Sequence, residues 1–251
     1  MEEKNKMGDF TLHFKLAHGR IADDIFNKQH ICIVVSTNSI TCKNFGMVRD
    51  IVQKYPYADV AGLRYSHPGW GDTAVLEDRS PEGSVYINQP PIYQHGATVA
   101  TIISQYGIGE CVEENTRAKE IIEKSADILY TSRLRHDTLQ NRITYFDKSL
   151  FKLSLQLKKS EFDHIKQVVI PAGIGRRGKM DNIWITKYLP IITNFAEDIS
   201  QVGKLCIILT CDEYLKFTEN RIKKSSSDSL NNCIKKLSNL AIITNDEINS
   251  V

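Results

Sequence analysis

Apolar residues, many of them β-branched, gather in short runs along the chain and predict the strands of a sheet. Residues 31–35, 97–103 and 167–170 are mainly apolar throughout, which is typical of strands buried on both faces. Further strands are predicted at residues 10–16, where apolar and polar residues alternate, and at residues 84–87 and 204–210. Apolar residues at helical spacing predict helices at about residues 45–55, 113–125, 137–158 and 181–199.

Strands that alternate with helices predict an α/β fold with a central, mixed and mostly parallel sheet between two layers of helices. The three mainly apolar strands each end in a polar or glycine-rich turn. Because ligands of such sheets bind in the crevice at the carboxyl ends of the strands, these three turns are predicted to converge. Residues 57–94 are rich in Gly, Pro, Asp and Ser and predict a functional loop system.

The length is sufficient for a single large domain, predicted here for residues 1–251 with its core at about residues 10–210. The polar run at residues 223–229 is typical of a flexible loop, and residues 230–251 are predicted to form a C-terminal extension. Hydrophobic and charged fractions of 41% and 25% are ordinary for a globular protein.

Charge and cysteine usage narrow the expected partners. A net charge of +2 does not indicate a nucleic-acid partner. No apolar run has the length of a membrane-spanning helix, and the N-terminus does not resemble a secretory signal. The six cysteines are scattered without a Cys-x-x-Cys pair, so we expect neither a zinc site nor disulfides. No other metal and no cofactor are expected. A reducing compartment, the cytoplasm or the nucleus, is expected.

The glycine-rich turn at residues 171–178 (PAGIGRRG) is the strongest candidate for a ligand site. Glycine lets the backbone approach a ligand closely, and consecutive N–H groups at the start of the next helix attract phosphate. Arg176 and Arg177 add positive charge, although a tight crossover with a basic rim explains the same residues. The Walker pattern is excluded because Lys179 is followed by Met180. The dinucleotide pattern is excluded because the turn comes late in the chain.

The other two turns hold candidate side chains. Asn38 can donate to and accept from ribose hydroxyls, but asparagine also caps turns and helices. Tyr106 can stack on a base or on a distal ribose, or it can cover the end of the sheet. Asp137 lies where a helix is predicted to begin and is expected to cap that helix. For catalysis, neither the serine-hydrolase elbow nor the His-Glu-x-x-His metal motif occurs.

Taken together, the turns resemble those of the macro domain, a module that binds ADP-ribose. Residues 34–39 (VVSTNS) are similar to the family's strand that ends in Asn-Ala-Ala-Asn-Ser, which implies that Asn38 contacts the distal ribose. Residues 43–49, with Gly46, stand where the family has its first phosphate loop. Residues 169–175, running on to Trp184, are similar to the second phosphate loop of the branch that reads Pro-x-Ile-Gly-x-Gly.

The resemblance implies that ADP-ribose, free or attached to a protein, binds with its diphosphate across the two loops. The implied ligand-binding residues are Arg20, Asn38, Gly46, Tyr106, Gly107, Gly173, Ile174, Gly175, Arg176 and Gly178. Arg20 replaces the aspartate with which the family reads adenine; an arginine can stack on the base but cannot accept that hydrogen bond.

The resemblance also identifies the positions at which catalytic residues are expected. In one hydrolase subgroup of the family a lysine attacks the ribose, whereas Ser104 and Gln105 occupy that place here. Hydrolysis of ADP-ribosylated protein, or of ADP-ribose 1''-phosphate, therefore requires a positioned water. Asp181 is the nearest candidate base, and Asn38 is the other candidate catalytic residue.

Two other functions stay open from the sequence. The missing adenine aspartate and the single glycine, Gly46, in the first loop are also expected of a macro-like interaction or structural protein that has lost ligand binding. An enzyme that acts on another nucleotide or on a phosphosugar would use the same crevice.

Overall fold

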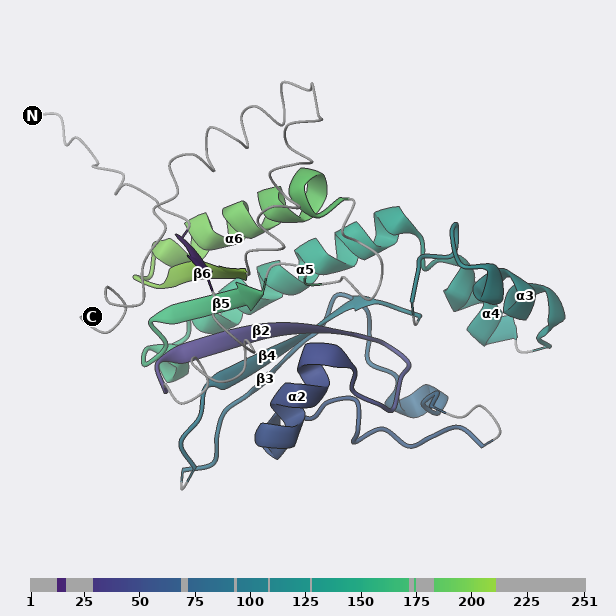
Figure 1. The fold of residues 1–251 in the computed structure, drawn as a ribbon, viewed down its shortest axis with the longest axis horizontal. Helices are drawn as coiled ribbons and strands as arrows, with labels where there is room; N and C mark the ends of the chain where they lie inside the picture. The colour runs from purple at the N-terminus through teal and green to yellow at the C-terminus, as the bar shows by residue number, and fades with distance from the viewer. Residues whose placement is uncertain are drawn as a thin grey trace, which may run out of the picture.

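The computed structural model describes residues 13–16, 29–68, 72–92, 94–107, 109–126, 128–171, 174 and 183–210. Within these ranges six strands form one sheet in the order β1-β6-β5-β2-β4-β3 (Figure 1). The strands are β1 His13–Leu16, β2 Ile31–Asn38, β3 Val85–Asn88, β4 Thr98–Gln105, β5 Gln167–Pro171 and β6 Leu205–Thr210. The helices are α2 Gly46–Lys54, α3 Thr116–Lys124, α4 Ile128–Arg135, α5 Leu139–Leu157 and α6 Leu189–Ser200, the last preceded by a π-helical turn, Trp184–Tyr188.

Strand direction in this sheet is mixed. β1, β6, β5, β2 and β4 pair in parallel, and the edge strand β3 runs antiparallel to β4. The predicted α/β class, with a central and mostly parallel sheet, is confirmed.

Helices cover both faces of the sheet. Successive side chains of a strand point to opposite faces, so each strand packs on both sides. In β2, Cys32 and Val34 pack with α5 and α6 in one core. Ile31, Ile33 and Val35 pack with α2 in a second core on the other face. The result is the predicted three-layer arrangement, with α5 and α6 on one side of the sheet and α2 on the other (Figure 1). Burial on both faces explains why these strands are apolar at successive positions.

The cap of the long helix α5 lies one residue later than predicted. The N-cap residue is Thr138, whose hydroxyl oxygen accepts a hydrogen bond from Asn141 N at 3.2 Å. The prediction that Asp137 caps this helix is therefore wrong. The carboxylate of Asp137 instead binds the backbone that follows β4, a contact across 30 residues of sequence that local spacing does not reveal.

Helices α3 and α4 form a hairpin beyond the carboxyl ends of β2 and β4 (Figure 1). The hairpin shares a small core with the ends of these strands, made of Ile40, Tyr106, Ala118, Tyr130 and Leu134. Helix α4 was not predicted from the sequence. Apolar and basic residues are mixed among its eight positions and do not form one apolar face.

The described residues of the 57–94 connection fold against the turn after β2. Two isolated antiparallel bridges join Thr41 to Thr73 and Ser66 to Ala74. The guanidinium of Arg64, only 7% exposed, donates from Nη1 to the carbonyl oxygens of Asn38 (3.0 Å) and Thr41 (2.7 Å). The connection therefore shapes the turn that carries Asn38, whereas its predicted functional role stays a prediction.

Two sequence predictions concern C-terminal residues that the structure does not describe. The loop at residues 223–229 and the extension at residues 230–251 lie outside the described residues, so the single-domain organisation stays a prediction. In the part of the chain that the structure describes, no helix is long and apolar enough to cross a membrane.

Candidate functional site

Three neighbouring parallel strands end at the same edge of the sheet. In the order β5-β2-β4 their last residues are Pro171, Asn38 and Gln105, and Asn38 pairs in register with Gln105. The ends of the three strands therefore lie side by side, whereas the predicted convergence of the turns stays a prediction, because most of the turn after β5 lies outside the described residues. Open α/β sheets bind ligands in the crevice at this edge, so it is the candidate functional site.

Asn38 occupies the middle of the edge and is 6% exposed. Its Oδ1 accepts hydrogen bonds from the backbone N–H groups of Ile40 (3.1 Å) and Thr41 (2.7 Å), so the side chain stabilises the turn after β2. Both hydrogen bonds use Oδ1, and neither occupies the amide nitrogen Nδ2. Asn38 therefore serves as the turn cap and still carries a donor suited to a ribose hydroxyl.

Tyr106 follows β4 and is 3% exposed, with its ring in the small core that the hairpin shares with the sheet. Its hydroxyl accepts a hydrogen bond from Arg79 Nη1 at 3.1 Å, and its ring lies 6.3 Å from that of Tyr130. Burial raises the pKa of Tyr106 to about 12 despite the nearby charge of Arg79, so the hydroxyl is neutral at physiological pH. The ring covers the end of the sheet and presents little surface for stacking on a ligand.

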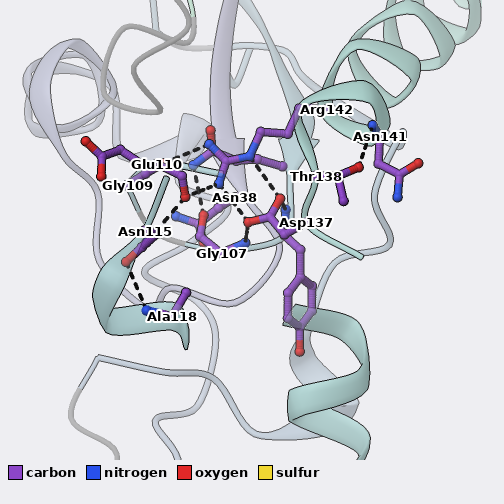
Figure 2. A network of polar contacts seen from close by, with 12 residues as sticks. Asn38, Gly107, Gly109, Glu110, Asn115, Ala118, Asp137, Thr138, Asn141 and Arg142 are labelled. Carbon is purple, nitrogen blue, oxygen red and sulfur yellow. Dashed lines mark hydrogen bonds and ion pairs between the residues drawn. The ribbon is translucent and has the colours of Figure 1, made fainter. Parts of the chain in front are cut away.

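A buried ion pair holds the backbone after β4 (Figure 2). Asp137 and Arg142 have side chains that are 1% and 0% exposed. Asp137 accepts from the N–H groups of Tyr106 (3.1 Å) and Gly107 (2.8 Å), and from Arg142 Nε (2.9 Å) and Nη2 (2.7 Å). Each charge is thus paired and hydrogen-bonded, as a buried ion pair requires.

The same arginine fixes the next residues of this loop. Arg142 donates from Nη1 to the carbonyl oxygen of Gly109 and from Nη2 to that of Glu110, each at 2.8 Å. One ion pair therefore attaches the backbone of Tyr106, Gly107, Gly109 and Glu110 to the start of α5. Sequence reasoning missed both roles, because apolar periodicity treats an arginine within a helix as exposed.

An open cleft of about 890 Å³ begins beside Gly107, between the turn after β2 and the α3–α4 hairpin. Its volume lies within the range of small-molecule sites, roughly 300–1,000 Å³. Six of its lining residues are Ile40, Gly107, Arg117, Glu120, Ile121 and Lys124. The sequence named Gly107 as a ligand-binding residue but gave no sign that α3 forms a wall beside it.

The remaining candidates divide into two groups. Gly46 is the first residue of α2 and has a φ of 55°, a left-handed conformation that favours glycine. Ile174 is 4% exposed and packs in the core with α5 and α6, while its N–H donates to the carbonyl oxygen of Pro171 at 3.1 Å. Outside the described residues lie Arg20, Gly173, Gly175, Arg176, Gly178 and Asp181.

Metal binding gains no support from the side chains at this edge. Among the residues that the structure describes, no group of three or more His, Cys, Asp or Glu side chains is placed to hold a metal ion.

Fold and edge together define an α/β protein with a candidate ligand site at the carboxyl ends of its central strands. No protein-family model matches the chain, and no curated protein matches its sequence. Solved structures with some similarity include Alphavirus P23pro-zbd, with a TM-score of 0.43 and 11% identity over 86% of this chain. This chain spans 25% of the length of that viral chain.

Two further structures are bacterial macrodomains. The macrodomain of Mycobacterium tuberculosis DarG has a TM-score of 0.43 and 10% identity, over 80% of this chain and 98% of that one. A mutant macrodomain of Oceanobacillus iheyensis has a TM-score of 0.39 and 11% identity, over 84% of this chain and 93% of that one. Scores this low establish neither a shared family nor a shared activity.

Proposed function

We propose that the chain binds ADP-ribose at the carboxyl edge of its sheet. The observation that carries the proposal is the position of Asn38 between the ends of β5 and β4, in the crevice where α/β sheets bind ligands. The resemblance of the turns to macro-domain loops names the ligand. In this proposal the distal ribose lies at Asn38, and the diphosphate lies between the turn after β2 and the glycine-rich turn after β5.

Two features support a diphosphate beside Asn38. Gly46 opens α2 with a left-handed φ, and the N-terminus of a helix favours an anion. On the other side, the turn that starts at Pro171 carries three glycines and two adjacent arginines in the sequence. Backbone N–H groups in such turns form concave anion sites.

The proposal also includes hydrolysis of the bound ADP-ribosylated ligand. Asp137, the carboxylate buried at this edge, already accepts four hydrogen bonds and is thereby excluded as a base. We assign the activation of a water to Asp181 and the positioning of the ribose to Asn38. The products would be ADP-ribose and the unmodified protein, or ADP-ribose and phosphate from ADP-ribose 1''-phosphate.

Calorimetric titration of the full chain with ADP-ribose, ADP and AMP tests the binding step. We expect ADP-ribose to bind at least tenfold more tightly than ADP, since only ADP-ribose reaches Asn38. Gly175→Glu adds bulk and negative charge to the glycine-rich turn and should abolish binding. Gln201→Glu places the same charge at the opposite edge of the sheet and should leave binding unchanged.

Other outcomes would select a different function. Equal binding of ADP and ADP-ribose would indicate an enzyme for another nucleotide or a phosphosugar. Absence of binding to all three would favour an interaction protein, which the use of Asn38 Oδ1 as a turn cap also favours. A melting curve of each variant separates lost binding from lost folding.

A further inference from the structure

The cleft beside Gly107 and the end of β5 lie on opposite sides of Asn38. The glycine-rich turn follows β5, Asn38 ends β2, and Gly107 follows β4, and these strands are adjacent in that order. A ligand whose diphosphate is held after β5 and whose distal ribose is at Asn38 therefore points its far end toward the cleft. That far end is the C1'' carbon, where a protein is attached to ADP-ribose.

One face of α3 forms a wall of the cleft. Arg117, Glu120, Ile121 and Lys124 are spaced three, four and seven residues apart and so share that face. Buried apolar side chains of the hairpin, including Tyr130 and Leu134, also line the cleft. This wall thus combines apolar surface with charges of both signs, as polypeptide binding requires.

Charge decides between the two kinds of macromolecule that carry ADP-ribose. The described lining has two cations, Arg117 and Lys124, and two anions, Glu120 and Asp72. Asp72 is additionally paired with Lys43 at 2.5 Å. Nucleic acid is bound by surfaces of concentrated positive charge, whereas this cleft is balanced, so a polypeptide fits it better.

The wall is held at a fixed position relative to Asn38. Asn115 caps α3 by accepting a hydrogen bond from Ala118 N at 3.0 Å, and its Nδ2 donates to the carbonyl oxygen of Glu110 at 3.3 Å (Figure 2). Glu110 is in turn bound by Arg142. The start of α3, the loop after β4 and the start of α5 therefore form one hydrogen-bonded unit.

We propose that this cleft binds the polypeptide segment that flanks an ADP-ribosylated side chain. The ligand is then an ADP-ribosylated protein, which contacts the sheet edge through its nucleotide and α3 through its backbone and side chains. This rests on the proposed function, because ADP-ribose at Asn38 sets the position of the attached segment. On the α3 wall an acidic residue of the segment can pair with Arg117 or Lys124, so we expect segments with acidic residues to bind.

The test compares three ligands by fluorescence anisotropy with the full chain. They are free ADP-ribose, a peptide with acidic flanks that carries ADP-ribose on a serine, and a single-stranded oligonucleotide that carries ADP-ribose. We expect the peptide to bind at least fivefold more tightly than free ADP-ribose and than the oligonucleotide. Equal affinities of the peptide and free ADP-ribose, or a preference for the oligonucleotide, would overturn the proposal.

A matched pair of variants on one helix gives the second readout. Lys124→Glu reverses a charge inside the cleft and should weaken peptide binding at least fivefold without changing the affinity for free ADP-ribose. Lys119→Glu reverses a lysine of α3 that does not line the cleft and should change neither affinity. Equal effects of the two variants would count against the cleft. If free ADP-ribose itself does not bind, the proposed function fails first and this proposal fails with it.

Discussion

Asp137 and Arg142 show how two charged side chains become part of a protein interior. Each is almost fully buried, and together they satisfy two backbone N–H groups and two carbonyl oxygens of the loop after β4. Removal of one partner would leave the other charged and buried without compensation. Such a change is far more costly than loss of an exposed ion pair.

We therefore expect Asp137→Ala to lower the free energy of unfolding by about 3–5 kcal/mol. Denaturant-induced unfolding measures the change. The control is Asp147→Ala, which alters an exposed carboxylate of α5 and should stay within about 0.5 kcal/mol of the wild type. A loss below about 1 kcal/mol for Asp137→Ala would contradict a structural role for the ion pair.

Single residues also mark the limit of prediction from sequence. Asn38 was recognised because it ends an apolar run, and the structure places it at the sheet edge. Arg64 and Arg142 were not recognised, because a buried arginine leaves no pattern among its sequence neighbours. Their carbonyl and hydroxyl partners lie 16 to 33 residues away in sequence, so only the folded chain brings these groups together.

Among the elements, strands were easier to predict than helices. The six described strands lie close to their predicted positions, and β2, β4 and β5 coincide with the mainly apolar runs because they are buried on both faces. β2 and β4 extend beyond their runs, to Asn38 and Gln105, because backbone pairing continues past the apolar side chains. α4 lacks one apolar face, and its place is set by packing against α3.

Helices α5 and α6 are joined across their surface by Lys158 and Asp198. Burial disfavours ionised Asp198, but hydrogen bonds from Lys158 and Ser154 and the charge of Lys158 outweigh it and lower the pKa of Asp198. A carboxylate with a lowered pKa stabilises the fold above its unfolded pKa, and this stability is lost as the pH falls through the folded value.

Asp198→Asn is accordingly expected to lower the free energy of unfolding by about 0.5–1 kcal/mol at pH 7 and to have little effect near pH 3. Urea unfolding at the two pH values measures the difference. Lys158→Gln removes the same ion pair from the other side and should reproduce both results. An effect of Asp198→Asn that is the same at pH 3 and pH 7 would show that the ion pair is not its cause.

In the described part of the molecule, one large core lies on each face of the sheet and one small core lies under the hairpin. The small core, which includes Ile40 and Tyr106, holds far fewer buried residues than either large core. Segments with few buried apolar contacts open at lower free energy than the core strands. Stability is therefore expected to be lower in α3 and α4 than in β2 and β4.

Hydrogen exchange followed by mass spectrometry checks this difference. Peptides from α3 and α4 should exchange at least tenfold faster than peptides from β2, β4 and the buried part of α5. A ligand with an attached peptide should slow exchange in α3, whereas free ADP-ribose should not. Equal protection of the hairpin and the central strands would mean that they unfold as one unit.

The attachment of the loop after β4 to α5 also bears on the free energy of the proposed ligand binding. Asp137 and Arg142 are five residues apart, so the turn that begins α5 brings them together without help from distant chain segments. Once they meet, the rim of the crevice is preorganised, and an arriving ligand does not have to order it. Association at this edge then loses little conformational entropy in the protein, which leaves more of the contact energy for affinity.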